Sequence, residues 1–391
     1  MGLPEPLKVV AVTGGRADWG LLSMPLAALR ADKAFALSLI VTGQHLVPGE
    51  ESSLAAIIDD GFVIAEQVDI KIGDDSPEGI AQSSGLGVAG IGATLARLKP
   101  DLMILLGDRY EILAAAFAAL IARVPIAHLC GGDITEGAMD DAFRHAITKL
   151  SHIHFVTNRS AHDRVIQLGE NPANVHCVGS PGLDRIRSTT VVTERTFFEH
   201  VGLVPRGRNF LVTYHPVTLE ADPLAECREM LAALDALGSN VGVLFTGANA
   251  DWGAHGIDKL IGDFVADHAN ARSVRTLGAE FYFAALAHVD AVVGNSSSGL
   301  YEAPSFATPT VNIGDRQKGR IKASSVIDCP GERSHILAAI ERALVLDCTG
   351  VVNPYGDGHA SERIHAVLAA IGSPQRLMRK HFHDLGLGLA S

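Results

Sequence analysis

Short runs of apolar, mostly β-branched residues alternate along the chain with longer segments rich in alanine and leucine. Such runs, separated by helical segments, are typical of parallel strands that are buried on both faces of a sheet. The strands expected in the first half are 9–13, 37–41, 102–106, 126–129 and 154–156. The strands expected in the second half are 210–214, 241–246, 291–293 and 309–313. This alternation predicts the α/β fold class with doubly wound parallel sheets.

A polar stretch over residues 183–208 interrupts the alternation near the middle of the chain. The chain has 391 residues, of which 47% are hydrophobic, so it is long enough for two separate cores. We therefore expect two α/β domains of similar size, residues 1–185 and residues 186–371, with a ligand cleft between them.

Charge and composition exclude several classes of partner and site. The formal charge of −12 would repel a nucleic-acid backbone, and no segment forms a concentrated basic patch. The longest uncharged apolar run, residues 112–122, is too short to span a membrane. Because the first residues lack a secretory signal and the five cysteines are scattered without a C-x-x-C pair, a cytoplasmic protein without disulfides is expected. No metal-binding motif occurs, so a catalytic metal is not implied.

Polar clusters directly follow six of the expected strands. In open α/β sheets, ligands bind at the carboxyl ends of strands, so these clusters are the best candidates for functional loops. They comprise residues 13–16, 107–111, 131–133, 215–216, 295–299 and 314–316.

Three of these candidates lie in the first half. Asp108 comes where a strand ends and a helix begins, so it is either a general acid or base or only a helix N-cap. Asp140 and Arg144 are four residues apart and share one helix face, which also fits an ordinary surface pair. Arg16 follows a glycine turn and is placed either to bind phosphate oxygens or to form a salt bridge across the domain boundary.

The second half carries a pattern typical of anion binding. Small polar residues including Ser296 and Ser297 follow an expected buried strand and open a helix, where backbone N–H groups can bind phosphate or the serines can merely cap. Glu302, one turn further on, is placed to accept hydrogen bonds from a sugar diol. His215 is a candidate to titrate near neutral pH and act on a leaving group, or is a structural histidine. Arg316 has the same alternatives as Arg16.

Seven segments together resemble one family. The chain is similar to the hydrolysing UDP-N-acetylglucosamine 2-epimerases, and it resembles the bacterial branch that serves sialic acid and legionaminic acid synthesis more than it resembles the non-hydrolysing epimerases. Non-hydrolysing relatives usually carry a lysine shortly after the arginine of the first loop, and residues 20–23 contain none. The matching segments are residues 13–20, 107–111, 131–137, 140–151, 215–218, 294–302 and 312–320.

The resemblance implies two Rossmann-like domains in the GT-B arrangement, with a C-terminal helix within 372–391 returning to the first domain. It also implies a reaction without a cofactor. The nucleotide-sugar loses UDP by elimination across C1 and C2, and water then adds to the glycal to give N-acetylmannosamine. Stabilising the departing diphosphate is the main catalytic task of such a reaction. Relatives form homodimers or homotetramers.

The resemblance also assigns roles to residues. Asp108 and Asp140 are the expected proton-transfer groups, with Arg144 positioning Asp140. Relatives often carry a catalytic glutamate where this chain has Cys130, and Asp133 is the nearest substitute. His215 completes the expected catalytic set. The expected residues for substrate and nucleotide are Arg16, Arg109, His45, Asn295, Ser296, Ser297, Glu302 and Arg316.

Other functions remain open at this level. The substrate is either UDP-N-acetylglucosamine, a UDP-2,4-diacetamido-2,4,6-trideoxy sugar, or a GDP-linked sugar, since pocket shape decides among them. A GT-B glycosyltransferase would need an acceptor site, whereas a sensor that only binds nucleotide-sugars would not need Asp108 and Asp140.

Overall fold

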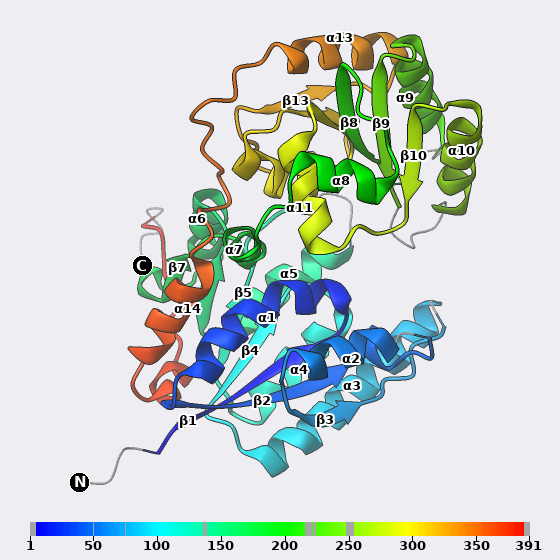
Figure 1. Cartoon of the computed structure of the whole chain (residues 1–391). Helices are drawn as coiled ribbons and strands as arrows, with labels where there is room; N and C mark the ends of the chain where they lie inside the picture. The colour runs from blue at the N-terminus through cyan, green and yellow to red at the C-terminus, as the bar shows by residue number, and fades with distance from the viewer. Residues whose placement is uncertain are drawn as a thin grey trace. The chain divides into compact units, whose positions relative to one another are not determined.

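The computed structural model describes residues 5–49, 51–74, 76–135, 139–215, 222, 224–247 and 254–386. The chain divides into two compact units (Figure 1). Met1–Arg185 and Tyr355–Ser391 form the first unit, and Ile186–Pro354 form the second.

The first unit contains a seven-stranded parallel sheet in the order β3-β2-β1-β4-β5-β6-β7. Its strands are β1 (Leu7–Thr13), β2 (Phe35–Thr42), β3 (Ile64–Val68), β4 (Leu102–Leu106), β5 (Ile126–Leu129), β6 (Ile153–Val156) and β7 (Val175–Cys177). Its helices are α1 (Arg16–Ala31), α2 (Glu51–Asp59), α3 (Pro77–Leu98), α4 (Tyr110–Ile121), α5 (Met139–Leu150), α6 (Arg159–Gln167) and α14 (Ala360–Ala369), with α7 (Asp184–Ser188) at the boundary.

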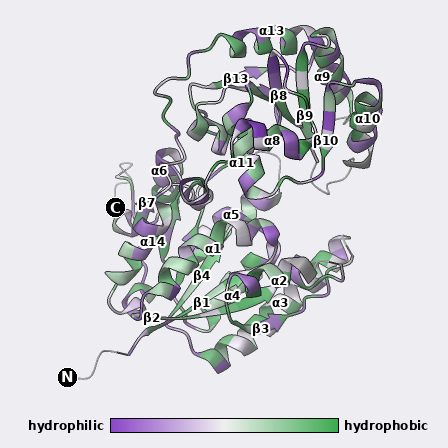
Figure 2. Cartoon of the chain, in the orientation of Figure 1, coloured by the Kyte–Doolittle hydropathy of each residue, from purple (hydrophilic) through white to green (hydrophobic). Residues whose placement is uncertain are grey.

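Both faces of this sheet are buried, which explains the continuous apolar strands. Successive side chains of a strand point to opposite faces. Val9 and Ala11 of β1 therefore belong to the core shared with α1 and α14, whereas Val10 and Val12 belong to the core shared with α3, α4 and α5. Hydrophobic colours run along the central strands of this unit (Figure 2).

The second unit repeats this design with six parallel strands in the order β10-β9-β8-β11-β12-β13. Its strands are β8 (Arg208–Thr213), β9 (Val241–Thr246), β10 (Ala271–Val274), β11 (Ala291–Gly294), β12 (Thr310–Ile313) and β13 (Val326–Cys329). Its helices are α8 (Glu194–Val201), α9 (Ala225–Ala236), α10 (Ala254–Asp267), α11 (Gly278–His288), α12 (Ser298–Tyr301) and α13 (Arg333–Leu344). Phe210 and Val212 face one core, and Leu211 faces the other.

The C-terminal segment joins the first unit earlier than the sequence suggested. We expected the return near residue 372, but the first unit resumes at Tyr355, and α14 precedes Gly372. The carboxylate of Asp184 accepts hydrogen bonds from the backbone N–H groups of Ala360 (2.9 Å) and Ser361 (2.6 Å) and so caps α14. The apolar face of α14 then packs against α1, which the alternation of strands and helices along the sequence does not reveal.

The strand order reverses once in each sheet. β1 lies between β2 and β4 in the first sheet, and β8 lies between β9 and β11 in the second. At such a reversal the connections leave in opposite directions and open a crevice at the carboxyl ends of the strands. A ligand site is therefore expected at the segments after β1 and β4, and at those after β8 and β11.

None of the described helices is both long enough and apolar enough to span a membrane.

Truncation of Ile364 tests the docking of α14. Ile364 is fully buried in the core shared with α1, so Ile364→Ala should reduce the free energy of unfolding by about 2–5 kcal/mol. Val352→Ala is the control, because Val352 is 80% exposed and its truncation should cost less than about 0.5 kcal/mol. Urea denaturation measures both. Equal effects would mean that α14 is not part of the first core.

Candidate active site

The loop after β1 meets the loop after β4 around Gly14. The Gly14 N–H donates to the Asp18 carboxylate (3.0 Å), and a Cβ on Gly14 would lie 2.8 Å from Oε1 of Glu111. Glu111 is completely buried, and its Oε2 has no hydrogen-bond partner among the described residues. Burial raises the pKa of Asp18 to about 7, and the nearby Glu111 carboxylate adds to this effect. Two carboxyl groups thus crowd one glycine at the strand reversal.

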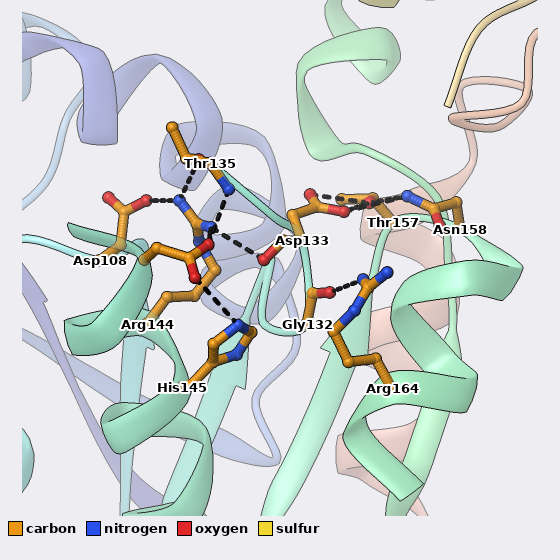
Figure 3. A network of polar contacts seen from close by, with 10 residues as sticks. Asp108, Gly132, Asp133, Thr135, Arg144, His145, Thr157, Asn158 and Arg164 are labelled. Atoms are coloured by element: carbon orange, nitrogen blue, oxygen red, sulfur yellow. Dashed lines mark hydrogen bonds and ion pairs between the residues drawn. The ribbon is translucent and has the colours of Figure 1, made fainter. Parts of the chain in front are cut away.

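Arg144 organises the polar cluster at the ends of β4 and β5 (Figure 3). Its side chain is buried, and its guanidinium forms an ion pair with Asp108. The same guanidinium donates to Oγ1 of Thr135 (2.9 Å), to the carbonyl oxygen of Asp133 (2.8 Å) and to Asp141 (3.3 Å). Asp108 does not cap α4, since Arg109 occupies the N-cap position. The N-cap alternative for Asp108 is therefore excluded.

Asp140 lies beside this cluster without pairing with Arg144. We expected an Asp140–Arg144 pair four residues apart, but Arg144 turns toward Asp108 and residues 133–135 instead. Asp140 is exposed overall, yet partial removal of its carboxyl group from water, together with the Asp108 charge, raises its pKa. Arg109, whose Nε donates to Glu111 (2.6 Å), adds an opposing charge nearby. Two carboxyl groups and two arginines thus share this edge of the sheet.

Asp133 contributes its backbone rather than its side chain to the cluster. Its carboxylate accepts hydrogen bonds from Asn158 (3.0 Å) and Thr157 (3.2 Å), which follow β6 (Figure 3). Cys130, the residue in place of the family glutamate, has a positive φ of 62°. Burial raises the pKa of the Cys130 thiol, so the thiol stays protonated. This geometry does not support Asp133 as a direct substitute for the glutamate.

His45 contacts Thr13 at the start of the loop after β1, and Arg16 is the first residue of α1, which follows that loop. The ring nitrogens of His45 lie 2.9 Å from Oγ1 of Thr13 and 2.5 Å from Oγ of Ser53. Burial lowers the pKa of His45 to about 4, so the ring is neutral and enclosed. We expected His45 to contact a ligand, but both of its nitrogens have protein partners. Arg16 is exposed at the first residue of α1.

In the second unit, His215 and Asn295 bridge the reversal between β8 and β11. The His215 N–H donates to Oδ1 of Asn295 (2.7 Å), and the Asn295 amide donates to the His215 carbonyl oxygen (2.8 Å). Arg316 and Gln317 both donate to the carbonyl oxygen of Asn295, at 3.1 and 2.9 Å. Asn295 is fully buried. Its hydrogen bonds join its own loop after β11 to the loops after β8 and β12.

His215 is not a cation in this environment. Burial, with the Arg316 charge as a second cause, lowers the pKa of His215 to about 4. We expected titration near neutral pH, but a positive charge beside Arg316 in a buried place is unfavourable. At neutral pH the imidazole therefore acts as a neutral hydrogen-bonding group.

The turn after β11 opens only a single helical turn. We expected Ser296 and Ser297 to start a helix with a substantial dipole, but α12 spans Ser298–Tyr301 and then gives way to a 3₁₀ turn containing Pro304. A proline near the start of the 3₁₀ turn fits its ring constraint but prevents continuation of the α-helix. This short α12 provides little of the helix dipole that we expected at Ser296 and Ser297.

Glu302 follows α12 and has one unsatisfied oxygen. Its Oε2 is buried and has no hydrogen-bond partner among the described residues. Burial raises the pKa of Glu302 to about 7, and a hydrogen bond from Ser298 partly opposes this rise. The hydroxyl group of Tyr282 on α11 donates to Oγ of Ser298 (2.5 Å). An unsatisfied buried acceptor is costly, so this oxygen is suited to a ligand donor.

Sequence reasoning missed the residues that support the candidates. Asp18 and Glu111 lie within two of the segments that resemble the family, residues 13–20 and 107–111. Both occupy positions in a helix, so the only signal for them was a charged residue on the helix face that is buried. Tyr282 and Gln317 carry no such signal, because their partners are distant in sequence. In the part of the chain that the structure describes, no group of three or more His, Cys, Asp or Glu side chains is arranged to hold a metal ion.

The raised pKa of Asp18 predicts a pH-dependent penalty on stability. The folded state retains the proton up to about pH 7, whereas the unfolded chain releases it near the ordinary aspartate pKa of 3.8, so stability should fall as pH rises between these values. Asp18→Asn keeps an acceptor for Gly14 without the charge and should be more stable than the unchanged protein at pH 8, but not at pH 4. Urea denaturation at both pH values measures this difference.

The exposed Asp59→Asn is the control for the loss of one carboxylate. A destabilised Asp18→Asn protein at pH 8 would contradict the protonated state of Asp18.

Comparisons with known proteins identify the family of the chain. The family described as UDP-N-acetylglucosamine 2-epimerase matches residues 27–369. A Legionella pneumophila protein named UDP-N,N'-diacetylbacillosamine 2-epimerase (hydrolyzing) is 35% identical over 374 residues, covering 95% of this chain and 98% of that protein. A Campylobacter jejuni protein named GDP/UDP-N,N'-diacetylbacillosamine 2-epimerase (hydrolyzing) is 35% identical over 323 residues, covering 82% and 84%. The crystal structure of a Neisseria meningitidis UDP-GlcNAc 2-epimerase bound to UDP-GlcNAc has the same fold, with a TM-score of 0.74 and 17% identity over 93% of this chain and 100% of that chain. The chain therefore belongs to the UDP-N-acetylglucosamine 2-epimerase family.

Proposed function

We propose that this chain converts a UDP-linked 2-acetamido sugar and water into UDP and the free sugar that is epimeric at C2. The family and the names of its relatives make the chain a hydrolysing nucleotide-sugar 2-epimerase. The observation that carries the proposal is the grouping of Asp108 and Asp140 with Arg109 and Arg144 at the carboxyl edge of the first sheet.

The two carboxyl groups suit the two proton transfers of the reaction. The C2 proton becomes removable only as the C1–O bond breaks, and inversion requires delivery of a proton on the opposite face. Asp108 is proposed to remove the proton, held in position by Arg144. Asp140, whose surroundings favour its protonated form, is proposed to deliver the other.

The second unit supplies the residues proposed for the nucleotide. Glu302 is proposed to accept hydrogen bonds from the ribose hydroxyls, because its Oε2 is buried without a partner among the described residues. Arg316 and the neutral His215, together with Ser296 and Ser297, are proposed to donate to the diphosphate as negative charge develops on it. Arg16 and Arg109 are proposed as further cations for this leaving group.

Two sugars are supported as the substrate. UDP-N-acetylglucosamine would give N-acetylmannosamine, a precursor suited to sialic acid synthesis. UDP-N,N'-diacetylbacillosamine, a 2,4-diacetamido-2,4,6-trideoxy sugar nucleotide suited to legionaminic acid synthesis, is supported by the names of the two relatives at 35% identity. Both sugars carry an acetamido group on C2, one of the two reacting carbons.

We also propose a homo-oligomer, as a dimer or tetramer. Its support is an apolar strip on α4 of the first unit, where Phe117, Leu120 and Ile121 are exposed.

Deuterated water tests the mechanism. During conversion of either sugar nucleotide, the released sugar should carry deuterium at C2, which mass spectrometry or NMR detects. Asp108→Asn removes the proposed base and should lower kcat by roughly 10²–10⁴-fold. Asp163→Asn is the control, because Asp163 lies exposed on α6 and should leave kcat unchanged. Release of UDP without label at C2 would contradict the elimination.

The choice of sugar is tested by comparing kcat/KM for the two UDP-sugars and their GDP counterparts under one set of conditions. The kcat/KM of the preferred UDP-sugar should exceed that of the other by at least about tenfold. Only one of the two sugars carries a 4-acetamido group, so a pocket shaped for one of them fits the other poorly. A GDP-sugar preferred over both UDP-sugars would contradict the proposed nucleotide.

A further inference from the structure

Glu302 is joined to α11 by a chain of two hydroxyl groups. The Tyr282 hydroxyl donates to Oγ of Ser298 at 2.5 Å, and Ser298 forms a side-chain hydrogen bond with the Glu302 carboxyl. The other carboxyl oxygen, Oε2, is buried without a partner among the described residues. One oxygen is therefore fixed by the protein, while the other is left for a ligand.

Burial is the main influence on the Glu302 carboxyl. Burial is the largest cause of the raised pKa of Glu302, and neither lysine nor arginine appears among the described groups that set it. Tyr282 is the titratable residue that faces Glu302 from α11, and burial raises the pKa of the Tyr282 hydroxyl, so that it remains a neutral donor. Arg320, from the segment after β12, lies over the ring of Tyr301 at 5.9 Å.

We infer that Tyr282 and Ser298 are positioning residues for Glu302, and that binding of a nucleotide ribose to Glu302 releases a proton to solvent. The inference rests on the proposed function, because it takes the ribose hydroxyls as the donors to Oε2. Neither residue touches the reacting carbons in this scheme. They fix the orientation and the ionisation of the carboxylate that does contact the ligand.

The direction of the coupling follows from hydrogen bonding. Near pH 7 the free protein holds Glu302 partly protonated, since its pKa is about 7. Ribose hydroxyl groups that donate to Oε2 favour the ionised carboxylate, so binding lowers this pKa. Affinity should therefore be highest above pH 7 and should fall by up to about tenfold per pH unit below that value.

Binding of UDP as a function of pH tests this coupling. Isothermal titration calorimetry at pH 6.5, in two buffers with different protonation enthalpies, should detect proton release on binding to the unchanged protein. The terminal phosphate of UDP also titrates, near a pKa of about 6. Glu302→Gln is therefore the reference: it should bind UDP more weakly, with only the pH dependence contributed by the phosphate and by His215.

Variants of the two hydroxyl groups test the positioning. Tyr282→Phe removes the donor to Ser298 and should raise the midpoint of the pH dependence by about half a pH unit, with weaker UDP binding below that midpoint. Ser298→Ala should shift the midpoint further, whereas Ser298→Thr retains the hydroxyl and should restore the original midpoint. Circular dichroism and urea denaturation identify any variant that fails to fold, and the folded variants decide the result.

The outcomes separate the inference from the proposed function. Identical pH profiles for the unchanged protein, Tyr282→Phe and Glu302→Gln would overturn the inference, while UDP binding and C2 labelling would leave the epimerase function standing. Failure of UDP to bind at any pH would overturn both.

Discussion

The reversal of strand order in each sheet is the constraint on which the candidate sites depend. β1 and β4 in the first unit, and β8 and β11 in the second, lie side by side but send their connections in opposite directions. The loops after these strands therefore face one crevice at the carboxyl edge of each sheet. Close approach at these points requires glycine: a Cβ on Gly14 would meet Glu111, and a Cβ on Gly294 would lie 2.0 Å from the Thr213 carbonyl oxygen.

Burial then determines which groups at these crevices are charged. Removal from water raises the pKa of Asp18 and Glu302 to about 7 and lowers the pKa of His45 and His215 to about 4. These four side chains can therefore lose their charge near neutral pH, because a neutral form avoids the desolvation penalty. Arginines retain theirs, since the guanidinium does not deprotonate in proteins.

The positive charge of both crevices is consequently carried by guanidinium groups that the protein holds in place. Arg144 is held by Asp108 and by the segment after β5, and Arg316 donates to the Asn295 carbonyl oxygen. Groups fixed before the reaction can stabilise developing charge without reorganisation when the bond breaks. An elimination that expels a diphosphate requires stabilisation of this kind, which connects the fold to the proposed chemistry.

The alternation of apolar runs and helical segments along the chain is sufficient to predict the fold class, the central strands and the loops that carry polar residues. The strands it did not reveal are β3, β7, β10 and β13, which are the outer strands of the two sheets. Outer strands are less completely covered, so polar residues such as Glu66 and Arg272 interrupt their apolar pattern. The partner of each candidate side chain follows from the folded chain: Asp108 rather than Asp140 for Arg144, Thr157 for Asp133, and two hydroxyl groups for His45. These partners are separated by up to 36 residues in the chain, so no local pattern relates them until the strands pair.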